Sequence, residues 1–226
     1  MNLEQFIEKF SEIRRMSFVE SRRRGPTGIG KTLEDLLGIT ENNIALPDFG
    51  NLELKAHRLS STNLITLFTF NRKVWKMNPL EAVRKYGTLD SSGRKGLYFT
   101  MSRVANSMDL FLFIDSEAVS VRHVSGEVLA EWNLTALAEQ FMKKIPAVVF
   151  VSAQVEIRAG NEWFHYTRAK LLKDTSPDIL KDQIAAGNVL IDLRLHDTGT
   201  SARNHGTGFR INPENMHLLY RDISEL

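Results

Sequence analysis

The chain has 226 residues, of which 42% are hydrophobic and 25% charged, with a net charge of +2. A chain of this length fits one domain, or one core with an added lobe, and buries enough apolar surface to fold without cross-links. It has no cysteine, which excludes a disulfide framework and a Cys-based zinc site. Residues 1–16 lack the apolar core of a signal peptide, and no apolar run approaches the roughly 20 residues that a membrane helix needs. We therefore expect a cytoplasmic protein without membrane contact.

The basic residues are clustered, although the net charge is small. Arg22–Arg24 are consecutive, further groups lie at 72–76 and 84–95, and Arg194, Arg203 and Arg210 lie near the end. A solvated surface is the ordinary interpretation of such groups, and a surface that faces nucleic acid is the alternative.

Hydrophobic periodicity predicts alternating helices and strands along the chain. Helices are predicted over residues 3–16, 30–37, 79–86, 134–144, 177–186 and 213–223. Strands are predicted over residues 51–58, 64–70, 97–101, 109–114, 118–124, 127–132, 147–157, 162–169, 188–196 and 208–211, and residues 197–208 are predicted to be a loop. The four strands from 97 to 132 suggest an antiparallel meander. The expected fold class is α/β, in the mixed α+β form.

Two motifs resemble functional signatures but lack their context. Residues 25–32 fit the G-x-x-x-x-G-K-[ST] phosphate loop, yet the arginine-rich residues before them do not form the buried strand that such a loop leaves. A glycine-rich entry to a helix, with Thr27 as N-cap, is the simpler interpretation. Residues 48–50 match a kinase magnesium triplet, but no catalytic loop of the H-R-D type precedes them.

A third motif, Asp48 followed by Glu53 and Lys55, predicts phosphodiester hydrolysis. Glu53 and Lys55 are two residues apart on a strand and therefore point to the same side. Asp48 precedes that strand, where its carboxylate can share a Mg²⁺ ion with Glu53. Lys55 can hold or help deprotonate an attacking water and offset the phosphate charge. Glu34, on the preceding helix, is either a further metal ligand or a solvated glutamate.

With these residues in place, the chain resembles the MvaI/BcnI restriction endonucleases, relatives of the MutH repair nickase. The resemblance covers most of the chain in the same order, with a weaker match over about 88–160. The segments that carry it are residues 30–39, 41–55, 62–68, 164–170, 189–194, 209–211 and 219–221.

The resemblance implies a PD-(D/E)XK nuclease core in a MutH-like architecture with two lobes around a DNA cleft. A catalytic lobe over about 1–145 and a recognition lobe over about 146–226 are expected within a single domain. It also implies a monomer that cuts double-stranded DNA at short CC…GG sites in a Mg²⁺-dependent reaction, with Asp48, Glu53, Lys55 and, less directly, Glu34 at the centre. A cognate methyltransferase would belong to the same system.

The resemblance implies that the C-terminal lobe recognises the bases. Asp192 and Arg194 share one face of a strand, and Arg can pair with guanine while Asp accepts from cytosine. An ordinary salt bridge worth ~0–1 kcal/mol is the alternative. Arg203, His205 and Arg210, in and after the following loop, are further candidates.

Two more positions are candidates for DNA contact. Thr69 stands where one branch of the family places a histidine near the central base pair, which leaves the preference for the central base open. His57 shares a face with Lys55 and either contacts DNA or is a satisfied structural histidine.

Three other functions compete with a restriction endonuclease. The first is a MutH-like nickase that acts in DNA repair, and the second is a DNA-binding module that does not cleave. The third is nucleotide binding through residues 25–32.

Overall fold

The computed structural model describes residues 1–39, 46–71 and 73–226, and these residues form two compact units. Unit 1 comprises residues 1–65, 142–175 and 213–226, and unit 2 comprises 66–141 and 176–212. Arg72 of one basic group and residues 41–45 of the resemblance lie outside the described residues.

The division expected near residue 145 does not match these units. Each unit combines segments from both halves of the chain, because strands far apart in sequence pair with each other. Residues 147–153 pair with 52–58 in unit 1, and residues 191–196 pair with 96–101 in unit 2.

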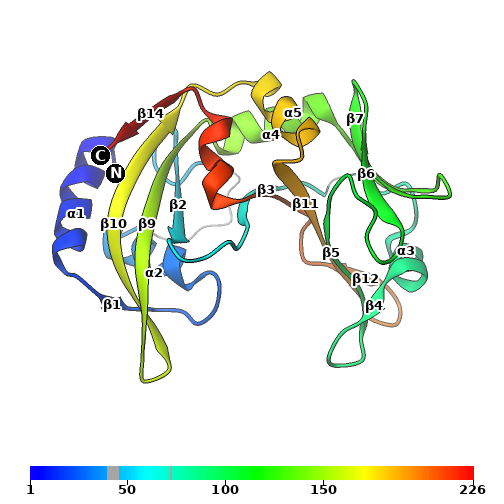
Figure 1. Cartoon of the computed structure of the whole chain (residues 1–226), viewed down its shortest axis with the longest axis horizontal. Helices are drawn as coiled ribbons and strands as arrows, with labels where there is room; N and C mark the ends of the chain where they lie inside the picture. The colour runs from blue at the N-terminus through cyan, green and yellow to red at the C-terminus, as the bar shows by residue number, and fades with distance from the viewer. Residues whose placement is uncertain (40–45, 72) are drawn as a thin grey trace. The chain divides into compact units, whose positions relative to one another are not determined.

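Unit 1 is built on a five-stranded sheet with two helices packed on it (Figure 1). Its elements are α1 (Leu3–Arg15), β1 (Val19–Glu20), α2 (Gly28–Leu37), β2 (Leu52–Arg58), β9 (Ala147–Arg158), β10 (Asn161–Lys173), the 3-10 helix η1 (Pro213–Leu219) and β14 (Asp222–Glu225). The strand order is β1-β10-β9-β2, and β14 also pairs with β10. The pairing of β2 with β9 is parallel, whereas the other pairs are antiparallel.

Apolar spacing and capping explain the two helices of unit 1. In α1 the buried residues Phe6, Phe10 and Ile13 recur at helical spacing, and Asn2 forms a capping box with Gln5. Helix α2 ends at Gly38, whose φ of 74° is the left-handed conformation that glycine adopts most readily. The core between these helices and the sheet includes the stacked rings of Phe6 and Phe49, whose centroids are 5.9 Å apart.

The start of α2 differs from the prediction and argues against a phosphate loop. The helix begins at Gly28, with Thr27 in the N-cap position but without a side-chain capping bond. The strand before it, β1, has two residues and pairs with β10. A phosphate loop instead leaves a buried strand, so the structure does not supply its context.

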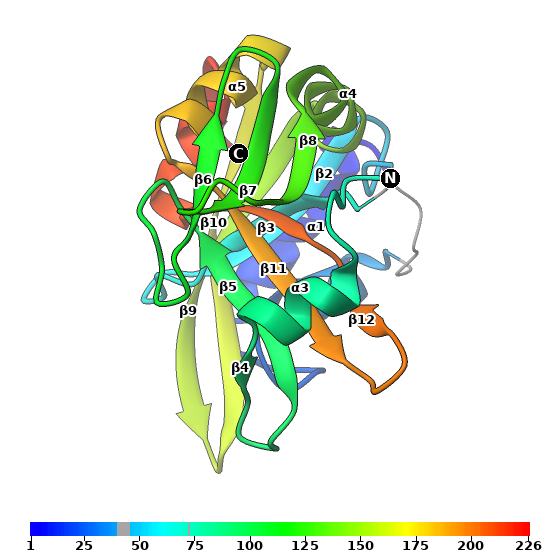
Figure 2. The ribbon, with the colours of Figure 1, turned by 90° about the vertical axis from the view of Figure 1, so that its right-hand side faces the viewer.

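Unit 2 contains a six-stranded and a three-stranded sheet (Figure 2). Its elements are β3 (Ile65–Thr69), α3 (Pro79–Tyr86), β4 (Thr88–Leu89), β5 (Lys95–Met101), β6 (Leu110–Ile114), β7 (Ala118–His123), β8 (Val128–Asn133), most of α4 (Leu134–Lys144), α5 (Pro177–Ala185), β11 (Val189–Asp197), β12 (Ala202–Asn204) and β13 (Gly208–Ile211). The larger sheet has the order β3-β13-β11-β5-β4, with β12 beside β11, and the smaller one is β6-β7-β8.

Three predictions about elements need correction. Strands β6, β7 and β8 form the expected meander, but β5 pairs with β11 in the other sheet. The loop predicted over 197–208 contains the short strand β12. The helix predicted over 213–223 is a 3-10 helix to Leu219, followed by β14. Pairing with β10 decides this last case, because it places Lys170 opposite Glu225 and Lys173 opposite Asp222.

Among the residues that the structure describes, no helix is long and apolar enough to span a membrane.

Replacing Phe6 by alanine tests the core of unit 1. Phe6 is fully buried, so Phe6→Ala should lower the free energy of unfolding by about 3–5 kcal/mol in urea denaturation. Its exposed neighbour Ile7 is the matched control, and Ile7→Ala should cost about 1 kcal/mol or less. Equal losses in the two variants would contradict the packing described here.

Candidate active site

The segment from Asp48 to Lys55 is fixed to the core through its apolar residues. Phe49 and Leu52 exchange two backbone hydrogen bonds of 3.1 and 2.9 Å around a tight turn, in which Gly50 has a φ of 60°. Phe49 and Leu54 belong to the buried core of unit 1. Because side chains alternate along a strand, Glu53 and Lys55 lie on the face of β2 opposite Leu54.

Glu53 is clamped between two lysines. It is 3% exposed. Lys55 Nζ lies 2.7 Å from Glu53 Oε1, and Lys144 Nζ lies 2.8 Å from Glu53 Oε2. The contact with Lys144 is an ion pair without the geometry of a directional hydrogen bond, and Lys144 also donates to the carbonyl oxygen of Leu46 at 2.7 Å. The structure thus confirms that Glu53 and Lys55 share a face and adds a second ammonium.

Lys144 is a residue that the sequence interpretation missed. It is the last residue of α4, three residues before β9 begins at Ala147. Ala147 pairs with Leu52, so the end of α4 lies beside the start of β2. The signal that could have found it is the pairing of residues 147–157 with 51–58, which periodicity alone does not give.

Asp48 is held beside this ion pair. Its Oδ2 atom accepts a 2.8 Å hydrogen bond from the backbone N–H of Leu54. Burial raises the pKa of the Asp48 carboxyl, and the negative charge of Glu53 raises this pKa further. The Leu54 N–H and the charges of Lys55 and Lys144 oppose that rise. Two carboxylates and two ammonium groups therefore interact at one edge of unit 1.

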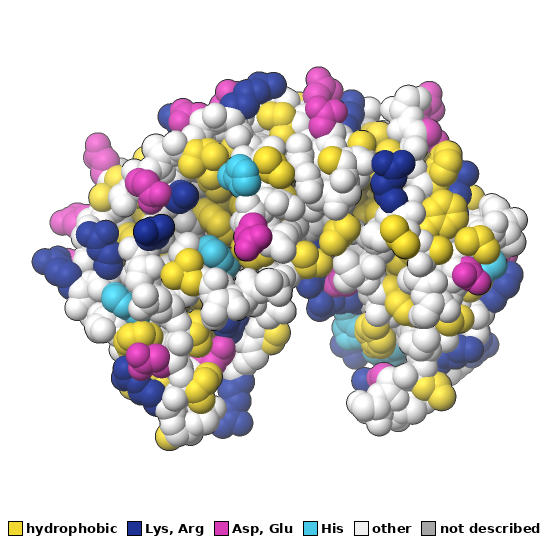
Figure 3. Space-filling view, viewed as in Figure 1, with side chains coloured by type: hydrophobic (Ala, Val, Ile, Leu, Met, Phe, Trp, Pro, Cys, Tyr) yellow, Lys and Arg dark blue, Asp and Glu magenta, His cyan; other side chains and the backbone are white. Residues whose placement is uncertain are grey.

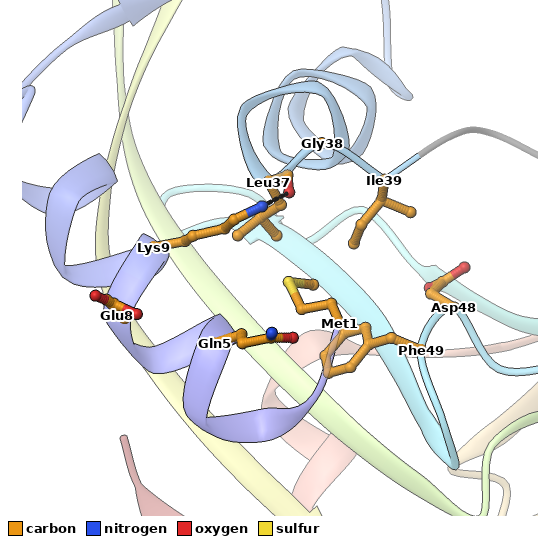
Figure 4. Close-up of a pocket in the computed structure, with 9 residues that line it drawn as sticks. All are labelled: Met1, Gln5, Glu8, Lys9, Leu37, Gly38, Ile39, Asp48 and Phe49. Carbon is orange, nitrogen blue, oxygen red and sulfur yellow. Dashed lines mark hydrogen bonds between the residues drawn. The ribbon is translucent and has the colours of Figure 1, made fainter.

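Asp48 and Phe49 also border a pocket of about 510 Å³. The other residues that line it come from the N-terminal segment with α1 and from the end of α2 with Ile39 (Figure 4). Lys9 Nζ bonds to the carbonyl oxygen of Leu37 at 2.7 Å across this pocket. Figure 4 places the second acidic residue of the pocket, Glu8, at the opposite end from Asp48.

Glu34 lies on the helix that packs against β2, and His57 lies on β2 itself, each in an environment different from that of Glu53. Glu34 is on α2, which packs against β2, and its charge adds to the burial that raises the pKa of Tyr166. His57 Nε2 lies 2.7 Å from Ser152 Oγ, and its ring stacks on Phe150 at 4.5 Å. Burial lowers the pKa of His57. These contacts fit a structural histidine well.

A second clamped carboxylate lies in unit 2. Asp192 is 7% exposed, and its Oδ1 accepts a 3.0 Å hydrogen bond from Thr100 Oγ1. Its Oδ2 lies 2.6 Å from Arg194 Nε and 3.1 Å from Arg210 Nε. Two guanidinium groups thus share one buried carboxylate, which leaves one net positive charge on this face of the sheet. The side chain of Arg194 is 46% exposed, so much of its guanidinium faces solvent.

Strand register explains how these side chains meet. Asp192 lies opposite Thr100, and Arg194 lies opposite Tyr98, in the pairing of β11 with β5. On the other side of β11, Gly208 pairs with Asp192. A Cβ atom at Gly208 would lie 3.3 Å from Arg210 Nε, so this glycine leaves the room in which Arg210 reaches Asp192. The sequence interpretation missed Tyr98 and Thr100. Their spacing places them on one face of a strand, but only the pairing of β5 with β11 shows that this face is the one that carries Asp192 and Arg194.

Histidines extend the same face. His196 Nδ1 lies 3.1 Å from both Tyr98 Oη and His205 Nε2, and the two imidazole rings stack at 5.0 Å. A pocket of about 380 Å³ is lined by Tyr98, Asp192, Leu193, Arg194 and His205. Figure 3 shows histidine and basic side chains gathered on the part of the surface that unit 2 forms. His196 is a further residue that the sequence interpretation missed.

The remaining candidates of unit 2 surround the loop before β13. Arg203 is exposed and pairs with His196 in the register of β11 with β12. Thr69 is exposed at the end of β3, and its Cγ2 atom lies 3.5 Å from the Cβ position of Gly206. Asn71 Oδ1 accepts a 2.8 Å hydrogen bond from the backbone N–H of Thr207. Unit 2 therefore brings together Thr69, Asp192, Arg194, Arg203, His205 and Arg210.

Comparison with known proteins identifies a family for this chain. The profile of the MvaI/BcnI restriction endonuclease family matches residues 7–220. Among solved structures, the restriction endonuclease MvaI in complex with its cognate DNA substrate is similar, with a TM-score of 0.82 and 28% identity over 100% of this chain and 99% of that chain. MvaI in the absence of DNA matches with a TM-score of 0.56 and 28% identity, over 100% and 98% of the two chains. No curated protein matches the sequence.

The match over nearly the whole chain agrees with the mixed α/β fold and with the resemblance seen in the sequence. The chain belongs to the MvaI/BcnI restriction endonuclease family and is a site-specific deoxyribonuclease.

Proposed function

We propose that this enzyme cuts both strands of double-stranded DNA at a short CC…GG-type site in a Mg²⁺-dependent reaction. The observation that carries the proposal is the ion pair of Glu53 with Lys55, together with the bond of Asp48 to the backbone N–H of Leu54 between these two residues. Asp48 and Glu53 would hold the metal ion, and Lys55 would assist the attacking water.

The donor set fits a hard divalent cation. Asp48 and Glu53 offer carboxylate oxygens, and the pKa of Asp48 is raised by burial and then by the charge of Glu53, so a cation that both residues held would relieve their repulsion. Over the described ranges of the chain, no group of three or more His, Asp or Glu residues could hold a metal. Mg²⁺ suits a site with two carboxylates, because it keeps several waters. When bound, it supplies Lewis acidity for phosphodiester hydrolysis.

Lys55 is proposed to act in two ways, on the charge of the phosphate and on the attacking water. Lys55 Nζ lies 2.7 Å from Glu53 Oε1, so its charge lies beside one of the two carboxylates that would hold the cation. As an ammonium group it would offset the charge that develops on the phosphate oxygens and orient the attacking water, whereas only as a neutral amine could it accept the proton of that water. Glu34, on the helix α2 that packs against β2, is proposed as a catalytic carboxylate near this centre but not as a third ligand of the metal.

The arginine pair of unit 2 is proposed to read guanine. Arg194 and Arg210 are both held by Asp192, and a guanidinium can pair bidentately with guanine O6 and N7. Both oxygens of Asp192 already accept hydrogen bonds within the protein, which favours a role in orienting the two arginines. Asp192 is also proposed to accept a hydrogen bond from cytosine. Thr69, Arg203 and His205 lie in the same unit and are proposed as further DNA contacts, as is His57 in unit 1.

Membership of the family supports a wider proposal about fold, location and partners. We propose a MutH-like arrangement on a PD-(D/E)XK core, with catalysis in unit 1 and base reading in unit 2. The enzyme would act in the cytoplasm as a monomer that cuts the two strands in successive events, alongside a methyltransferase that protects the same site.

Digestion of plasmid DNA with and without Mg²⁺, followed by sequencing of the fragment ends, tests the activity. We expect discrete double-strand fragments only with Mg²⁺, with ends in a CC…GG context. Nicks as the final product would support the MutH-like nickase instead. If every DNA that is tested stays intact in the presence of Mg²⁺, a DNA-binding module that does not cleave is favoured.

Removing either carboxylate tests the catalytic assignment. Asp48→Asn and Glu53→Gln should abolish metal-dependent cleavage, because each removes a charged oxygen ligand, while DNA binding in a gel-shift assay persists. Glu156→Gln changes an acid of β9 that is 47% exposed and serves as the control with wild-type cleavage. Near wild-type cleavage by Asp48→Asn or Glu53→Gln would show that the assignment is wrong.

Replacing Arg194 tests base reading. Arg194→Ala should weaken specific DNA binding by roughly 1–3 kcal/mol and relax the preference at one position of the site. Arg103 is an exposed arginine of unit 2 that bonds to the carbonyl oxygen of Ala185, and Arg103→Ala should leave specificity unchanged. Unaltered site preference in Arg194→Ala would remove this residue from the reading role.

A further inference from the structure

Lys144 makes a contact that the proposed chemistry does not use. We propose that Lys144 is a positioning residue that holds Glu53 and competes with the catalytic divalent cation for Glu53 Oε2. This inference rests on the proposed function, in which Asp48 and Glu53 hold that cation.

Both oxygens of Glu53 are occupied by ammonium groups. Lys55 Nζ lies 2.7 Å from Oε1, and Lys144 Nζ lies 2.8 Å from Oε2. Together with Asp48, these groups carry two negative and two positive charges, so the centre neutralises its own charge. Because Glu53 is 3% exposed, a cation can reach its carboxylate only by taking the place of one of these ammonium groups or by sharing an oxygen with it.

Of the two lysines, Lys144 is better suited to release Glu53. Its ammonium already donates to the carbonyl oxygen of Leu46 at 2.7 Å, so it keeps a partner after it leaves the carboxylate. Its contact with Oε2 also lacks the geometry of a directional hydrogen bond, unlike that of Lys55 with Oε1. The cation can therefore gain Oε2 at a smaller cost than Oε1.

The position of Lys144 is built into the fold. The next residue, Ile145, is fully buried, and its carbonyl oxygen accepts a 2.9 Å hydrogen bond from the buried phenol of Tyr220. Two residues later β9 begins and pairs with β2. The side chain of Lys144 is 19% exposed, the same as that of Lys55. Lys144 is thus held against Glu53 by the main chain on its C-terminal side.

A competing role and a purely supporting role of Lys144 predict opposite changes in the affinity for the metal when Lys144 is replaced. If Lys144 only shaped the site, its loss would disorder Glu53 and weaken metal binding. If it competes, a neutral residue at 144 removes a positive charge beside the metal site and tightens metal binding by the protein without DNA.

The test measures Mn²⁺ binding to the full chain without DNA, by electron paramagnetic resonance of the free ion. Lys144→Met and Lys144→Gln should each lower the Kd for Mn²⁺ by at least about tenfold, because a unit charge about 4 Å from a divalent ion changes its affinity by more than one decade even in water. Lys144→Arg keeps the charge and should stay within about twofold of wild type. Lys143→Met changes the exposed neighbour on the same helix and is the matched control.

The outcomes separate this inference from the proposed function. Equal or weaker Mn²⁺ binding by the two neutral variants, with native circular dichroism, would overturn the competing role of Lys144. If Lys144→Met does not fold, Lys144→Gln decides alone, because its amide can still donate to Glu53 and Leu46. Asp48→Asn should abolish Mn²⁺ binding, and undiminished binding by this variant would remove the metal site itself and with it both proposals.

Discussion

The parallel pairing of β2 with β9 is the interaction on which the rest of the structure depends. It places the end of α4 beside the start of β2 and so brings Lys144 to Glu53, although the two residues are 91 positions apart in the chain. Parallel strands cannot be joined by a tight turn and need a long crossover. In this protein the crossover carries the whole segment 66–141 of unit 2.

Each unit pairs one buried carboxylate with two basic side chains, which are lysines in unit 1 and arginines in unit 2. In each, a strand places an acidic and a basic residue two positions apart, and another element adds a second base: Lys144 on Glu53, and Arg210 on Asp192. Lysine presents a compact charge on a flexible stem, which can yield to another cation. Arginine presents a planar fork that stays charged and keeps a fixed orientation, which suits the recognition of a base edge.

Much of the local structure could be predicted from the sequence, because periodicity and capping are local. The helix of residues 134–144 and the shared face of Glu53 with Lys55 follow from spacing alone. Lys144, Tyr98 and the strand β14 could not be predicted in this way, because each depends on a partner distant in the chain. The lobe boundary expected near residue 145 does not match the two units for the same reason. Each unit consists of segments that alternate along the chain, and one boundary in the sequence cannot separate them. The roles of the site residues rest on the family resemblance and on their contacts, and they stay predictions.

The interleaving also has a consequence during synthesis. Domains usually fold in order as the chain leaves the ribosome, but here neither unit is a continuous stretch. Strand β2 has to wait for β9, and β5 has to wait for β11, before either sheet can close. A nascent chain that has passed Lys55 therefore carries Asp48, Glu53 and Lys55 without the strand and the second lysine that complete their surroundings. The topology ties assembly of the nuclease to the late stages of translation.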